Sequence, residues 1–214
     1  MANTNGYQKI TTMGTDVPLR VAKGHYATNH AHTNYYLDLS LIKSRASEAK
    51  GIAQSLTSLY LYGTTIDTII ADEGTQVIAA YLAEELTKAG VLNTNAHKTI
   101  YIVTPEFNSN SQIILRDNLK PMVDGKHILI LMGNLTTGKT ANRVVEAVQY
   151  YGGILSGIAA VFSAIDNLNG IPVRSVFGKA DLPDYAFYDY HECPMCKAKQ
   201  KIDGLANAFG ISML

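Results

Sequence analysis

The stretch that decides the fold is Ile128-Leu-Ile-Leu-Met-Gly-Asn-Leu-Thr-Thr-Gly-Lys-Thr140, in which a run of large apolar residues passes into a Gly- and Thr-rich turn. Residues 128–132 form the most apolar run and predict a strand at the centre of a sheet. A loop is expected over 133–138 and a helix over 140–151, where valines recur on one face. This order predicts an anion site, because N–H groups at a helix N-terminus carry partial positive charge.

Outward from this stretch, apolar strands alternate with amphipathic helices. Strands are expected at 35–39, 67–71, 99–103, 157–164 and 173–177, and helices at 44–61 and 74–89. This alternation predicts an α/β domain with a parallel sheet and helices on both faces. Ligands of such sheets bind at the carboxyl ends of the strands, where the loop after Met132 lies.

The composition excludes several classes of protein. The 214 residues suit one domain, and 47% hydrophobic residues are enough for a core. Acids and bases balance at 18 each, without the basic stripe typical of nucleic-acid binding. No apolar run reaches the roughly 18 residues of a membrane span, and residues 1–15 lack a signal-peptide pattern. We therefore expect a cytoplasmic protein that binds neither nucleic acid nor membrane.

Taken alone, residues 133–140 also match the nucleoside-triphosphate P-loop, G-x-x-x-x-G-K-[ST]. Their position argues against it, because a P-loop domain builds most of its sheet after the motif and only residues 141–214 follow here. The acid that such a site needs for Mg²⁺ has one candidate, Asp166, which lies beyond the expected strand end. A turn capped by a threonine is the plainer alternative, but Thr-Thr-Gly-Lys-Thr supplies more donors than a cap uses.

The same stretch resembles the phosphoribosyl-pyrophosphate (PRPP) motif of the type I phosphoribosyltransferases. In that motif, four apolar residues precede two acids, two further residues and Thr-Thr-Gly-x-Ser/Thr. Three other segments are similar, in the same order, to the orotate phosphoribosyltransferases: residues 24–38, residues 67–80 and Glu192-Cys-Pro-Met-Cys196. The resemblance spans residues 24 to 196 and implies the α/β fold of that family.

The resemblance also implies an organisation and an activity. A phosphoribosyltransferase-like domain would cover residues 21–214 after an N-terminal arm at 1–20, with a small hood from about 21–43 and 180–214. Its activity would be transfer of ribose 5-phosphate from PRPP to a pyrimidine-like base, with Mg²⁺ and release of pyrophosphate. The implied ligand is PRPP or a nucleoside monophosphate, and the implied assembly is a homodimer.

The resemblance assigns residues to the parts of the site. Thr136, Thr137, Gly138, Lys139 and Thr140 would hold the 5′-phosphate; Asp72, Glu73, Gly74 and Thr75 would form the pyrophosphate loop; His30, His32 and Tyr36 would approach the base. The acids at 72–73 could instead form a solvated turn at a helix start, which the helix dipole favours. The histidine segment could instead be a surface or a dimer interface.

The chain departs from the family at the reaction centre. Met132 and Gly133 stand where the family has two acids that bind the ribose hydroxyls. Each charge-assisted hydrogen bond contributes about 1.5–3 kcal/mol, so losing both weakens transition-state binding roughly a hundredfold to ten-thousandfold. Residues 104–112, which correspond to a mobile basic loop, contain no Lys, Arg or His, although Arg116 and Lys120 follow and could substitute. Two hypotheses remain: a transferase with weakened or lost catalysis, and a non-catalytic PRPP- or nucleotide-binding module.

Two cysteines lie in the motif Cys193-Pro-Met-Cys196. With His191 nearby, they could form half of a zinc site whose other half a second subunit supplies. They could instead belong to a tail with two reduced thiols. The histidines near residue 30 could also bind a metal, but their spacing is not diagnostic, so the sequence assigns no metal ligand.

Overall fold

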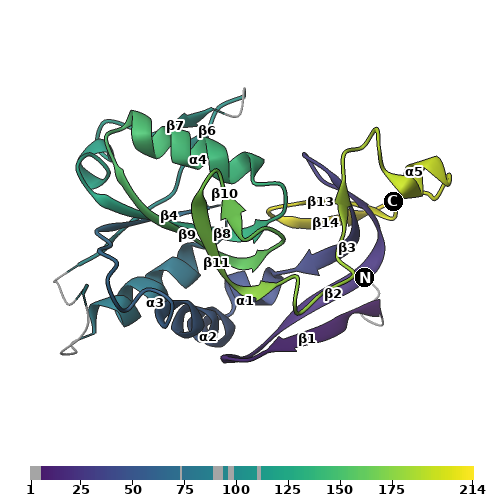
Figure 1. Cartoon of the computed structure of the whole chain (residues 1–214), viewed down its shortest axis with the longest axis horizontal. Helices are drawn as coiled ribbons and strands as arrows, with labels where there is room; N and C mark the ends of the chain where they lie inside the picture. Colours follow the sequence, from purple (N-terminus) through teal and green to yellow (C-terminus); the bar gives the residue numbers. More distant parts are fainter. Residues whose placement is uncertain (1–5, 73, 89–93, 96–98, 110–111) are drawn as a thin grey trace.

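The structure is a computed structural model of the chain, and it describes all residues except 1–5, 73, 89–93, 96–98 and 110–111. The described residues form an α/β body and, beside it, a second sheet built from both ends of the sequence (Figure 1). We call this second sheet the hood.

The α/β body is built on a six-stranded sheet in the order β10-β11-β9-β8-β4-β5. Its strands are β4 (Thr68–Ala71), β5 (Tyr101–Val103), β8 (His127–Leu135), β9 (Ile154–Ser163), β10 (Asn167–Leu168) and β11 (Ile171–Gly178). All neighbours pair in parallel except the short β10, which is antiparallel to β11. The apolar strand β8 lies in the interior of the sheet, between β4 and β9, which confirms its predicted central position.

Helices cover both faces of this sheet, as predicted (Figure 1). The helices are α1 (Ser40–Ser44), α2 (Ala46–Thr57), α3 (Gln76–Thr87) and α4 (Lys139–Tyr150). Alternate residues of β8 face opposite layers, because successive side chains of a strand point to opposite sides. Leu129 and Leu131 pack with α2 and α3, whereas Ile130 and Met132 pack with α4. Burial of these side chains on both faces holds the layers together.

Several expected boundaries differ from the structure by a few residues, and two of the differences have a clear physical reason. The helix expected at 44–61 corresponds to α2, which begins only at Ala46 because Arg45 has extended backbone angles, and which ends at Thr57; the short α1 precedes it. The strand expected to end at Met132 continues to Leu135, because Asn134 and Leu135 still pair with Phe162 and Ser163 of β9. The loop before α4 is therefore only residues 136–138.

The hood is a six-stranded sheet in the order β12-β3-β2-β13-β14, with β1 also paired to β2. Its strands are β1 (Gln8–Thr12), β2 (Thr15–Ala27), β3 (His32–Asp38), β12 (Phe187–Tyr188), β13 (Gly204–Asn207) and β14 (Gly210–Met213). Residues 8–20 are thus strands of the hood, whereas the sequence suggested a separate arm. Leu19 and Leu37 pack into the same cluster as α2 and α3, which fixes the hood to the α/β body.

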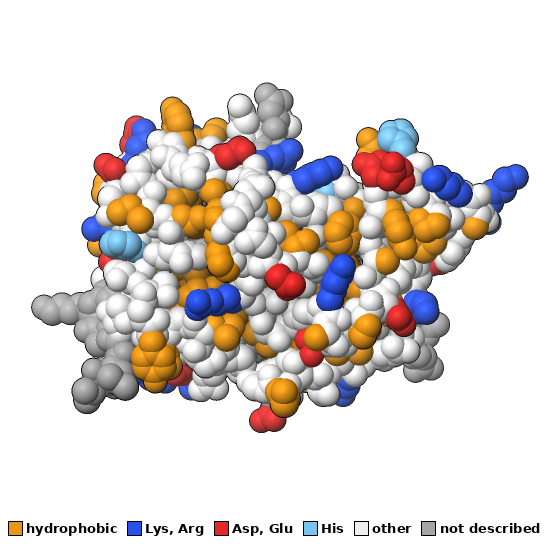
Figure 2. All heavy atoms as spheres, in the orientation of Figure 1, with side chains coloured by type: hydrophobic (Ala, Val, Ile, Leu, Met, Phe, Trp, Pro, Cys, Tyr) orange, Lys and Arg blue, Asp and Glu red, His pale blue; other side chains and the backbone are white. Residues whose placement is uncertain are grey.

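The remaining described elements are short. A hairpin of β6 (Glu106–Phe107) and β7 (Ile113–Ile114), a 3₁₀ turn η2 (Lys120–Met122) and the helix α5 (Pro194–Lys197) complete the fold. Among the described helices, none has the length and apolar character needed to span a membrane. On the face shown in Figure 2, basic and acidic side chains are scattered among each other.

Candidate phosphate-binding site

The loop Thr136–Thr140 joins the carboxyl end of β8 to the first turn of α4. Gly138 is the N-cap of α4 and has a φ of +76°. A β-carbon at this position would lie 2.6 Å from Leu168 Cδ1, so the loop requires glycine both for its backbone angle and for its packing. The first N–H groups of a helix have no partner inside the helix, and such groups are suited to bind an anion.

Threonine hydroxyls line this loop. Thr136 Oγ1 lies 3.0 Å from the hydroxyl of the buried Tyr185, and Thr137 Oγ1 accepts a 3.4 Å hydrogen bond from the Lys139 amide. Thr140 Oγ1 lies 3.3 Å from His30 Nε2. The hydroxyls are thereby held in place around the helix N-terminus. All five predicted phosphate-binding residues lie together at the junction of β8 and α4.

His30 brings the hood to the phosphate loop. It lies in the turn between β2 and β3, 110 positions before Thr140. Burial lowers the pKa of His30, and the positive charges of Arg143 and Lys139 lower it further. These two cations make the surroundings of the loop electropositive, which suits a phosphate.

The predicted pyrophosphate loop follows β4 as a tight turn. The Thr75 amide and hydroxyl donate to the Asp72 carbonyl at 2.9 and 2.7 Å, and Gly74 has a φ of +80°. Thr75 is fully buried, so its hydroxyl closes the turn rather than facing solvent. Helix α3 begins directly after it, at Gln76. Glu73 lies outside the described residues.

Lys43 is a site residue that the sequence reasoning missed. A β-carbon at Gly133 would lie 2.8 Å from Lys43 Cε and 3.0 Å from its Nζ, and one at Gly74 would lie 3.3 Å from the same Nζ. The Lys43 ammonium also donates a 3.1 Å hydrogen bond to the Ala208 carbonyl. The lysine therefore lies beside both the pyrophosphate loop and the position of the second missing acid. The only signal in the sequence was the glycine at 133, which leaves room for it.

The two basic residues that could substitute for those of the mobile loop are paired with acids. Arg116 donates to both carboxylate oxygens of Glu106, at 2.8 and 2.6 Å, across the β6–β7 hairpin. Lys120 lies 2.7 Å from Asp117. Both ion pairs are solvent-exposed and therefore contribute little to stability. They nevertheless engage these cations away from the phosphate loop.

The base-side candidates separate in the structure. His30 reaches the phosphate loop, whereas His32 Nδ1 lies 3.2 Å from Cys196 Sγ. Tyr36 packs its ring near those of Tyr7 and Tyr26, with centroid distances of 6.4 and 6.0 Å, and burial raises its pKa to about 12. Tyr36 therefore belongs to a tyrosine cluster of the hood, so the three residues have different immediate neighbours.

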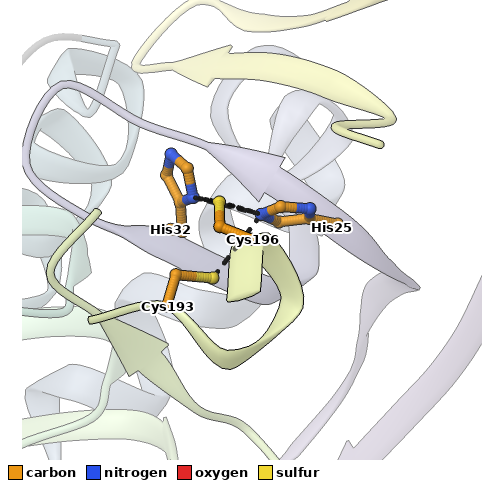
Figure 3. A group of neighbouring side chains, drawn as sticks. All are labelled: His25, His32, Cys193 and Cys196. Atoms are coloured by element: carbon orange, nitrogen blue, oxygen red, sulfur yellow. Dashed lines mark hydrogen bonds between the residues drawn. The ribbon is translucent and has the colours of Figure 1, made fainter. Parts of the chain in front are cut away.

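The cysteine motif has its partners within the same chain. His25 and His32 lie beside Cys193 and Cys196, with their donor atoms all within 4.8 Å of one another (Figure 3). His191, which the sequence suggested as a companion, is exposed and is not part of this group. The second half of the cluster thus comes from β2 and β3 rather than from another subunit.

Comparisons with known proteins agree with this geometry, although no family model matches the chain. The chain is 25% identical to the orotate phosphoribosyltransferase of Campylobacter fetus over 192 residues, covering 84% of this chain and 89% of the relative. It is 39% identical to the orotate phosphoribosyltransferase of Mycobacterium avium over 66 residues, covering 28% of this chain and 37% of the relative.

Solved structures show the same fold. The orotate phosphoribosyltransferase of Mycobacterium tuberculosis, in complex with inorganic phosphate, has a TM-score of 0.50 and 22% identity, covering 70% of this chain and 81% of its own. The adenine phosphoribosyltransferase of Thermoanaerobacter pseudethanolicus has a TM-score of 0.52 and 19% identity, covering 67% and 88%. The UMP synthase of Leishmania donovani has a TM-score of 0.56 and 16% identity, covering 84% and 36%.

The sheet, its helices and the loop before α4 define a protein with the type I phosphoribosyltransferase fold. Among proteins of this fold, the chain resembles orotate phosphoribosyltransferase in sequence, which is the name of both curated relatives. The resemblance and the fold class expected from the sequence are thereby confirmed.

Proposed function

We propose that this protein binds a phosphorylated ribose ligand, PRPP or a nucleoside monophosphate, through its 5′-phosphate, and that its phosphoribosyl transfer is weak or lost. One observation carries the proposal. The phosphate loop Thr136–Thr140 is complete at the N-terminus of α4, while Met132 and Gly133, just before it, offer no carboxylate.

The binding half of the proposal rests on backbone donors. A phosphate at the start of α4 would accept hydrogen bonds from amides of the first turn and from threonine hydroxyls. Lys139 is exposed, so it would add charge at the edge of the site rather than a buried contact. The related fold solved with inorganic phosphate is consistent with such a ligand.

The proposal that phosphoribosyl transfer is weak or lost rests on the surroundings of positions 132 and 133. Met132 is 2% exposed and packs into the apolar cluster under α4, so this position has no polar group for a ribose hydroxyl. At Gly133, the neighbour is the Lys43 ammonium, a donor where the family has an acceptor. Preorganised groups of this kind affect rates by roughly 10²–10³ each.

Magnesium fits these residues poorly. Mg²⁺ prefers oxygen ligands, and Asp72 is the one acid among the described residues of the pyrophosphate loop. The Lys43 ammonium beside Gly74 and Gly133 would repel a divalent cation from that side. We therefore derive no step that passes through Mg²⁺.

A transferase with a rebuilt reaction centre is the second candidate. It is favoured by the same Lys43, whose positive charge beside Gly74 would stabilise a leaving pyrophosphate. The homodimer and the pyrimidine-like base remain predictions from the resemblance, and the cytoplasmic location remains a prediction from the sequence.

Calorimetry tests the proposal. Binding of PRPP, orotidine monophosphate, ribose 5-phosphate and ATP would be measured with and without Mg²⁺, followed by orotate turnover on the same sample. We expect the ribose phosphates to bind without added Mg²⁺, and turnover to be absent or very slow. Rapid turnover would establish the rebuilt transferase, and failure of all ribose phosphates to bind would overturn the site assignment.

A further inference from the structure

Four side chains from distant parts of the sequence converge in the hood. His25 comes from β2 and His32 from β3, while Cys193 and Cys196 flank the start of α5 in the C-terminal segment (Figure 3). His25 and Cys193 are fully buried, although they are 168 positions apart. Both cysteines are free thiols.

The distances among the four donor atoms fit a single tetrahedral ion. His25 Nε2 lies 3.1 Å from His32 Nδ1 and 3.6 Å from each cysteine sulfur, and His32 Nδ1 lies 3.2 Å from Cys196 Sγ. With Zn–S bonds of about 2.3 Å and Zn–N bonds of about 2.0–2.1 Å, a regular tetrahedron places its ligand atoms roughly 3.3–3.8 Å apart. These four separations lie within a few tenths of an ångström of that range, and the other two pairs of donor atoms lie within 4.8 Å.

The hydrogen bonding of His25 leaves its ligand nitrogen available. Its Nδ1 lies 3.1 Å from the Gln200 carbonyl, to which it donates its proton, so Nε2 carries a lone pair. That single lone pair faces one imidazole nitrogen and two thiols at once. One lone pair cannot accept from three donors, whereas a cation at the centre would take an electron pair from each of the four atoms.

We propose that His25 Nε2, His32 Nδ1, Cys193 Sγ and Cys196 Sγ bind one zinc ion. Two thiolates would neutralise Zn²⁺, so that the buried site carries no net charge. Two sulfur and two nitrogen ligands in a tetrahedron are typical of zinc, and the spacing fits a single ion rather than a larger iron–sulfur cluster. All four positions are filled by protein, which defines a structural and not a catalytic metal.

The ion would fasten the C-terminal segment to the hairpin of β2 and β3. The same segment is also joined to β2 by the pair Gly204↔Tyr26 and by a 2.7 Å hydrogen bond from the His25 amide to Asp203. The two histidine ligands flank the turn that carries His30 to the phosphate loop. The zinc site would therefore set the position of that turn, although the proposal does not depend on the nature of the ligand.

Metal analysis of the full-length protein tests the site. The chain would be produced in zinc-supplemented medium, purified without chelators, and analysed for metals by mass spectrometry and for free thiols. We expect one zinc ion per chain, and a lower melting temperature after removal by a chelator. Replacement by Co²⁺ should give the visible bands of a tetrahedral ion together with thiolate-to-cobalt charge transfer. This measurement uses the unmodified chain and needs no variant to fold.

Variants then identify the ligands. Cys196→Ser and His32→Ala should each lose most of the bound zinc, while His191→Ala, at the nearby exposed histidine, should keep it. Zinc well below one ion per chain, iron in its place, or a Co²⁺ spectrum without thiolate bands would overturn the proposal. Equal zinc loss in His191→Ala and His32→Ala would also overturn it. Half an ion per chain would indicate a site shared between two copies, contrary to the proposed set.

Discussion

The unit formed by β8 and α4 contains two neighbouring segments, of which one keeps the PRPP motif that the unit resembles and the other departs from it. Residues 136–140 keep every feature of a phosphate loop, whereas Met132 and Gly133 have lost both acids. The first part depends on backbone amides and one glycine, and the second on side-chain carboxylates. Backbone donors survive most substitutions, but a carboxylate is removed by one. Under the proposed function, binding and transfer are therefore separable along a few residues of the chain.

The largest effect is expected from restoring an acid at Met132. Met132→Asp would place a carboxylate in the apolar cluster under α4, where the side chain is 2% exposed. We expect a loss of about 3 kcal/mol or more in the free energy of unfolding, measured by urea denaturation. Met132→Leu should cost less than about 1.5 kcal/mol. Equal stability of the two variants would mean that position 132 can accept an acid and that its loss reflects function alone.

The next effect concerns the glycine of the phosphate loop. Gly138→Ala would force a side chain into a φ of +76° and against Leu168. We expect a loss of about 2 kcal/mol in stability and a loss of most affinity for ribose 5-phosphate. Gly125→Ala is the matched control, because it has a φ of +67° with nothing within 4 Å of the added carbon. If both variants bound ribose 5-phosphate like the parent, the loop would not be the phosphate site.

A smaller, selective effect is expected at Lys43. Its ammonium lies beside Gly74, so Lys43→Ala should weaken PRPP binding by roughly tenfold and leave orotidine monophosphate binding nearly unchanged. Calorimetry with both ligands measures the difference. Lys179→Ala, at an exposed lysine outside the site, controls for the general loss of charge. Equal weakening for both ligands would place Lys43 at the shared phosphate instead.

The smallest effect is expected at Lys139. This side chain is exposed at the start of α4, so Lys139→Ala should change ribose 5-phosphate affinity by less than about threefold. ATP binding and hydrolysis would be assayed on the same variant. A P-loop protein would instead lose triphosphate binding when this lysine is removed. Such a loss would contradict the resemblance on which the site is assigned.

The sequence predicted the α/β body well, because strand and helix patterns there are local. The predicted end of β8 was wrong, because Gly133-Asn-Leu135 has the composition of a turn but still belongs to the strand that pairs with β9. The strand β2 (Thr15–Ala27) was missed entirely, because its first residues are interrupted by Pro18 and its last belong to a segment rich in His and Tyr. Its partners, β3 and β13, are not visible from local pattern.

The residues of the candidate site were likewise predicted where they are close together in the sequence, and missed where distant segments meet. The phosphate loop is one continuous segment, so its residues could be named in advance. Lys43 was missed because it meets Gly133 only through the packing of α1 against the sheet end. His25 and His32 could not be matched with the cysteines, because that pairing depends on how the C-terminal segment returns to β2.

The topology of the hood sets an order of events during synthesis on the ribosome. The strands of the α/β sheet all lie between residues 68 and 178, so this sheet can form while the later segment is still being made. Strand β2 can pair early with β1 and β3, but it gains its neighbour β13 only after residue 204 has been made. Pairings between such distant segments form slowly. The hood is therefore completed only near the end of translation, long after its N-terminal strands have been made.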